Sequence, residues 1–205
     1  MSWGRCALSD PAIALLEFDS ISAGIVAGDA MVKSSPVGSI YAGSVHPGKY
    51  LVLVTGDTAS VELALEIGVG IGATHLTDSV FLADVHPGVT SAIVGANVGA
   101  SLRHEALGIV ETVSVSAAID AADAGAKAAD VIVSSVQLAD GLGGKGYVLF
   151  SGPVSEVEAC VEAAVSRTEP HGALVRSDII AQLHEEMAEN LVSQLRFMKR
   201  VEGTG

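Results

Sequence analysis

The chain has 205 residues, of which 49% are hydrophobic, 4% aromatic and 17% charged. This is far more apolar material than a disordered chain carries, and the length allows one domain or two small ones. The 24 acidic residues outnumber the 11 basic ones and give a formal net charge of −13, so no nucleic-acid partner is expected.

Neither a membrane segment nor an export signal is predicted. The longest uncharged run, 88–102, has 15 residues and three glycines, which is too short and too polar to span a bilayer. The first residues lack the basic and then apolar order of a signal peptide. Two cysteines, Cys6 and Cys160, make no disulfide framework, so we expect a cytoplasmic protein without a membrane partner.

An internal repeat organises the chain. At an offset of 94 residues, Glu17 matches Glu111, Asp29 matches Asp123 and Lys33 matches Lys127; at an offset of 96, Lys49 matches Lys145. The second copy therefore has two extra residues in its hairpin loop. The repeat predicts a leader at 1–11, a first domain at 12–97, a connector at 98–105 and a second domain at 106–200.

Hydrophobic period and turn residues predict the same elements in both copies, in the order β-α-β-β-α-β plus a closing helix. First strands are expected at 12–18 and 107–113, fourth strands at 79–85 and 173–180, and closing helices at 87–97 and 182–195. The first helices follow the caps Ser20 or Ser22 and Ser114 or Ser116, and the second helices start at Asp57 and Pro153. Buried stripes are expected at Ile21, Ile25 and Val32 and at Val115, Ile119, Ala122 and Ala126. The fold class is α+β, a small sheet with helices on one face.

Each copy has a glycine-containing hairpin between its second and third strands. The first tip consists of Ser44, Val45, His46, Pro47 and Gly48, and the second of Asp140, Gly141, Leu142, Gly143 and Gly144. A phosphate-binding role is not expected for the second loop, because no Ser or Thr follows Lys145 and the loop joins two strands. Glycines instead let several backbones crowd together and allow an open and a closed loop conformation.

These features resemble the shell domain of bacterial microcompartments, in both copies and over nearly the whole chain. The resemblance rests on Asp-Ala-x-x-Lys in the first helix, a Gly-Lys hairpin and Gly-x-x-x-x-Val-Glu at the second helix. The most similar type is the tandem-domain trimeric shell protein of propanediol utilisation. It implies two tandem ferredoxin-like β-α-β-β-α-β-α domains per chain and a pseudo-hexameric homotrimer. Such tiles pack with other shell proteins around encapsulated enzymes, and small metabolites cross a central pore.

The resemblance also assigns roles to residues. It places both hairpin tips at the pore, and Lys33, Lys127 and His184 at the tile edge. The propanediol relative has a cysteine where this chain has His46, and three such cysteines hold an iron–sulfur cluster there, so no conventional cluster is expected here. The edge motif Pro-Arg-Pro-His is replaced by 181–184, Ala-Gln-Leu-His, without the arginine.

Three roles remain open for His46. On a three-fold axis, three imidazoles could hold a metal ion. They could also simply border the pore. Since an ordinary histidine titrates near pH 6.5, they could instead make an acidic pore attract anions.

No catalytic constellation is evident, so an enzyme is not expected. His75, His86, His104, His171 and His184 are scattered, and no Ser or Cys nucleophile is paired with a base in a known motif. Two alternatives to a shell protein are a tandem regulatory domain that binds small molecules and an electron-transfer subunit built on the same tile.

Overall fold

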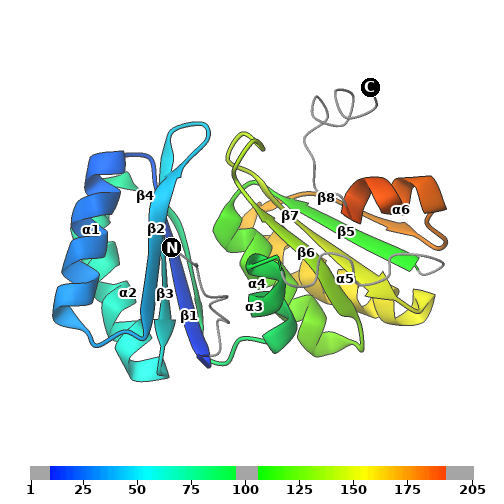
Figure 1. Cartoon of the computed structure of the whole chain (residues 1–205), viewed down its shortest axis with the longest axis horizontal. Helices are drawn as coiled ribbons and strands as arrows, with labels where there is room; N and C mark the ends of the chain where they lie inside the picture. The colour runs from blue at the N-terminus through cyan, green and yellow to red at the C-terminus, as the bar shows by residue number, and fades with distance from the viewer. Residues whose placement is uncertain (1–9, 96–105, 193–205) are drawn as a thin grey trace, which may run out of the picture.

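A computed structural model describes residues 10–95 and 106–192, which form two domains of the same design (Figure 1). The first comprises β1 (Ala12–Phe18), α1 (Ile21–Ser34), β2 (Ser39–Val45), β3 (Lys49–Gly56), α2 (Thr58–Gly72), β4 (Leu76–Leu82) and α3 (Pro87–Ile93). The second comprises β5 (Ala106–Thr112), α4 (Val115–Ala128), β6 (Ile132–Leu138), β7 (Gly146–Gly152), α5 (Val154–Thr168), β8 (Leu174–Ile180) and α6 (Glu185–Val192). The predicted connector and most of the predicted leader lie outside the described residues.

Each domain contains a four-stranded antiparallel sheet. The strand orders are β2-β3-β1-β4 and β6-β7-β5-β8, and the central strands β1 and β5 each pair with two neighbours. Two helices, α1 and α2 or α4 and α5, pack against one face of each sheet. The predicted ferredoxin-like order is therefore confirmed in both copies.

The predicted helix starts are close to those observed. Ser20 and Ser114 cap α1 and α4 by accepting a hydrogen bond from the backbone N–H three residues on. Asp57 caps α2 in the same way, and Pro153 precedes the first turn of α5. The Asp57 carboxyl has a lowered pKa because Ser60 donates hydrogen bonds to it.

The fourth strand of the first domain was predicted too late in the chain. It spans Leu76–Leu82 and not 79–85, because it must pair with β1 along its whole length, from Leu76 beside Phe18 to Leu82 beside Ile13. The closing helix α3 is shorter than predicted and ends at Ile93. α6 begins at Glu185, three residues later than predicted.

The predicted buried stripe of the first helix is wrong for the single chain. α1 turns its small residues to its own sheet, where Gly24 lies against Tyr50 and Gly28 against Val52. A Cβ added at Gly24 would lie 2.5 Å from the Tyr50 ring, so only glycine permits this close approach. The larger stripe residues Ile21 and Ile25 consequently point away from the sheet and are exposed.

The two domains share one continuous core. The helix-bearing face of the first sheet packs under α1 and α2, while its opposite face, with Ile13, Leu15 and Val80, joins the core of the second domain. Helix α4 contacts β1 and β4 there, so its residues Val115 and Ile119 are fully buried. The second domain thus covers the sheet face that the first domain leaves open.

Candidate functional site

The two hairpin tips lie side by side. Nδ1 of His46, at the first tip, is 3.0 Å from Oδ1 of Asp140 at the second. Both side chains are largely solvent-exposed, at 75% and 60%. The two predicted pore loops therefore meet within one chain, and they bring an imidazole and a carboxylate together at an exposed position.

The second tip has a backbone that requires glycine. Gly141, Gly143 and Gly144 have φ values of +78°, +66° and +87°, which lie in the left-handed region. A Cβ at Gly144 would lie 3.3 Å from both Pro47 Cδ and Lys49 Cε of the first hairpin. These glycines thus allow the second tip to turn tightly against the first.

An apolar cavity of about 360 Å³ opens beside the first hairpin. Ser44 and Val45 of the predicted pore loop line it, together with Leu53 from β3 and Ile93 from α3. The base of the first hairpin is therefore mostly apolar, while the two tips carry the polar groups.

Glu17 joins the domains at a buried position that sequence reasoning did not identify. Its side chain is fully buried; Oε2 accepts a hydrogen bond from Lys49 Nζ at 3.0 Å, and Oε1 accepts one from the backbone N–H of Ser116 at 2.6 Å. Ser116 lies in the first turn of α4, where unpaired N–H groups favour a carboxylate. The matching glutamates of the repeat were the available signal, but the repeat does not show which groups they bind.

The repeat partner of Glu17 lacks this second contact. Glu111 Oε1 accepts a hydrogen bond from Lys145 Nζ at 2.7 Å, and the pair is partly exposed. In the repeat, Ser116 corresponds to Ser22, which lies in the first turn of α1 and is exposed. Glu111 and Ser22 are thus the repeat partners of the two groups that meet in the contact between Glu17 and Ser116.

The two predicted edge lysines have different surroundings. Lys127 Nζ donates to the Asp84 carbonyl of the first domain at 2.5 Å and to the Asp123 carboxylate at 2.6 Å. Within the described residues, Lys33 Nζ forms one hydrogen bond, to the Asp29 carboxylate at 2.6 Å. An edge role for both remains a prediction, and Lys127 has in addition a role at the domain junction.

His184 and its repeat partner His86 show the same asymmetry. The Nδ1 atom of each accepts a backbone N–H two residues on, from Glu186 and Gly88. The backbone N–H of His86 also donates to Asp123 across the junction, at 2.8 Å. The predicted edge role of His184 remains a prediction.

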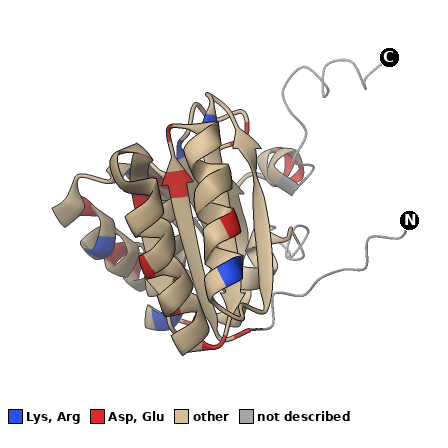
Figure 2. Cartoon of the chain, turned by 90° about the vertical axis from the view of Figure 1, so that its left-hand side faces the viewer, with Lys and Arg blue, Asp and Glu red and all other residues tan. Residues whose placement is uncertain are grey.

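Exposed apolar residues on α1 correspond to buried ones on α4. Ile21, Ile25 and Val32 are 45%, 52% and 39% exposed, whereas their repeat partners Val115, Ile119 and Ala126 are 0%, 0% and 6% exposed. Figure 2 views the side that carries α1 and α2, and most of the length of these two helices has the colour of uncharged residues. Exposed apolar faces are typical of interaction sites.

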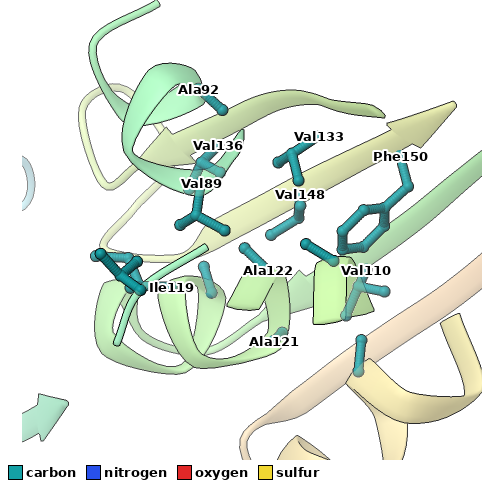
Figure 3. Packing of buried hydrophobic residues seen from close by; sticks show 14 of the residues in the cluster. Val89, Ala92, Val110, Ile119, Ala121, Ala122, Val133, Val136, Val148 and Phe150 are labelled. Atoms are coloured by element: carbon teal, nitrogen blue, oxygen red, sulfur yellow. The ribbon is translucent and has the colours of Figure 1, made fainter. Parts of the chain in front are cut away.

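The closing helices repeat this pattern. Val89 of α3 is fully buried against Val133 and Val136 of β6, beside α4 (Figure 3). Its repeat partner, Met187 of α6, is exposed, and so is Ile40, which corresponds to Val133. Helix α3 of the first domain thus covers β6 of the second domain beside α4. Among the described residues, no closing helix covers β2 in the same way.

Within the described residues, no three His, Cys, Asp or Glu side chains are close enough to hold a metal ion together. No described helix is long and apolar enough to cross a membrane.

Comparison with known families identifies both domains. The BMC domain matches residues 12–85 and 106–183, which is most of the chain. The chain belongs to the BMC domain family, with two copies in tandem. The BMC chain is 39% identical over 181 residues to the bacterial microcompartment shell protein PduT of Citrobacter freundii, covering 88% of this chain and 97% of PduT.

Other similarities agree with this family. A microcompartment protein of Desulfitobacterium hafniense has a crystal structure similar to this BMC chain, with a TM-score of 0.78 and 37% identity over 88% of this chain and 99% of that one. The carboxysome shell protein CsoS1C of Halothiobacillus neapolitanus is 41% identical over 90 residues, which is 42% of this chain and 87% of that protein. These matches favour a shell protein over the tandem regulatory alternative.

Proposed function

We propose that this BMC chain is a structural subunit of a bacterial microcompartment shell, in which three chains close a ring of six domains around a central pore. The observation that carries the proposal is the pairing of exposed and buried repeat partners on α1 and α4. Because the first sheet already receives α4, the equivalent face of the second sheet is expected to receive α1 of another chain.

The expected contact can be described from the one within the chain. Glu111, already paired with Lys145, would accept the backbone N–H of Ser22 from the next chain, as Glu17 accepts that of Ser116. Met187 of one chain would pack against Ile40 of the next, as Val89 packs against Val133. A head-to-tail contact of this type builds a ring when its rotation closes. Two equivalent domains per chain make three chains sufficient for a six-sided tile.

Ring closure would bring three copies of each hairpin tip to the centre. The polar tips, with His46 and Asp140, would then border the opening that small metabolites cross. The formal charge of −13 per chain and the Asp140 carboxylate at each second tip favour cationic or neutral solutes over anions.

His46 is suited to hold a metal ion on this axis. When the Nδ1–H of a histidine donates to a carboxylate, as it can to Asp140, the ring is oriented and its Nε2 atom is available as a ligand. Three imidazoles with one open position form a known zinc geometry. An iron–sulfur cluster does not fit, because residue 46 offers no thiolate.

The trimer is tested by charging the exposed stripe. Ile25→Glu places a charge where the ring contact is expected, so this variant should elute as a monomer in size-exclusion chromatography with light scattering. Leu63→Glu is the matched control, because Leu63 is exposed on α2 and its repeat partner Ala159 is also exposed. The control should stay trimeric. A trimeric Ile25→Glu protein, or a monomeric wild type, would refute the proposed ring.

A further inference from the structure

A second cavity, of about 300 Å³, lies between the two domains of one chain. Its walls include Asp78 and Ser79 of β4, Ser116 and Asp120 of α4, Arg167 of α5 and His171 of the 3-10 turn that follows. This volume is at the lower end of the range for small-molecule sites. Most of its lining residues are polar or charged, in contrast to those of the apolar cavity beside the hairpins.

Ser116 is one of the residues that line this cavity, and its hydroxyl is buried without a partner in the described part of the chain. The residue is 1% exposed, and its Oγ atom has no hydrogen-bond partner among the described residues. Buried polar atoms nearly always have a partner, so a water molecule, an ion or another bound group is expected at this one. The backbone N–H groups of Ser116 and Ala117 are already bonded, to Glu17 and to the Ser114 hydroxyl. The helix N-terminus therefore offers no free N–H at these two positions, and the hydroxyl is the open group.

The cavity also has a negative and a positive side. The Asp78 carboxylate accepts hydrogen bonds from the Ser79 N–H and from the Ser114 hydroxyl, but no described Lys, Arg or His forms an ion pair with it. Arg167 donates from Nε to Asp120 at 2.8 Å, and its terminal N–H groups have no acceptor among the described residues. The Asp78 carboxylate, which has no ion-pair partner among the described residues, and the terminal N–H groups of Arg167 thus border the same cavity.

These charges are specific to this junction. In the repeat, Asp120 corresponds to Val26, Arg167 to Ile71 and Asp78 to Arg176. The equivalent junction between two chains would therefore lack this set of groups. The polar cavity is not a by-product of domain duplication, and every residue that lines it belongs to a single chain.

We propose that this cavity binds a small zwitterionic amino acid. Its ammonium group would pair with Asp78, its carboxylate would take the terminal N–H groups of Arg167, and the Ser116 hydroxyl would bond to either end. A simple anion would meet two carboxylates, and a simple amine would meet a guanidinium, so each alone fits less well. The site does not depend on ring closure, and its failure would leave the proposed shell function untouched.

L-Alanine is a suitable probe, because its methyl signal reports binding to the full chain in saturation-transfer difference NMR. L-Alanine should bind at least tenfold more tightly than ethylamine or propionate, each of which carries one of the two charges. Ser116→Ala and Asp78→Asn should each weaken binding by roughly tenfold, since each removes one hydrogen bond or one charge from the site. Ser166→Ala is the control, because this hydroxyl bonds only within α5, to the Glu162 carbonyl.

Circular dichroism and the elution volume of each variant verify that it is folded. Equal affinity for glycerol, for ethylamine or for propionate would overturn the proposal. So would the absence of saturation transfer from wild-type protein, or a signal that survives in both folded cavity variants.

Discussion

Glu17 and Glu111 provide a quantitative test of the ring, because they are repeat partners in different surroundings. Glu17 is buried and holds both Lys49 and the N-terminus of α4. Removing one partner of a buried ion pair costs about 3–5 kcal/mol. Glu17→Gln retains an oxygen that can accept the Ser116 N–H, so we expect about 2–4 kcal/mol of lost unfolding free energy.

Glu111→Gln should depend on assembly. In a lone chain, Glu111 is part of a half-exposed pair with Lys145, and such pairs contribute about 0–1 kcal/mol. In a closed ring, Glu111 would be buried like Glu17, and the same substitution should cost about 2–4 kcal/mol per contact.

Urea unfolding measures both effects in two backgrounds. In the Ile25→Glu background, which should be monomeric, Glu17→Gln lowers the unfolding free energy substantially and Glu111→Gln hardly changes it. In the trimeric wild-type background, the two substitutions should have similar effects. If Glu111→Gln is silent in both backgrounds, Glu111 does not join two chains and the inferred contact is wrong.

Three further predictions concern single groups. Burial raises the pKa of the Cys160 thiol from 9.0 to about 12, so Ellman's reagent should not label the native protein at pH 8 in a variant without the other cysteine. The folded state favours the neutral thiol, so the contribution of Cys160 to the free energy of unfolding is complete below pH 9 and is lost as the pH rises toward 12. Rapid labelling of the native protein would contradict this prediction. Replacing Lys33 and Lys127 by Ala should leave soluble trimers but prevent ordered sheets in electron microscopy, and sheets of the double variant would disprove the edge role. Zinc added to the trimer should bind one ion per three chains by calorimetry; His46→Ala should abolish this binding, Asp140→Asn should weaken it about 10–100-fold, and unchanged zinc binding by His46→Ala would exclude the site.

The sequence was sufficient for the architecture, because its signals are local and occur twice. Each of these signals depends only on neighbouring residues: the strand and helix periods, the Ser20 and Asp57 caps and the Pro-Gly turn. Because the signals occur in both copies, the elements predicted for one copy can be checked against those of the other. The resemblance placed both hairpin tips at one pore, and the structure brings His46 beside Asp140.

The tertiary structure decided how each apolar face is used. Hydrophobic period shows that Ile25 lies on a stripe, but it does not say whether that stripe faces its own sheet or another chain. Gly24 and Gly28 settle this by letting α1 approach its sheet with the opposite face. Contacts between domains, such as Glu17 with Ser116, join residues 99 positions apart, and only packing in three dimensions specifies such a pair.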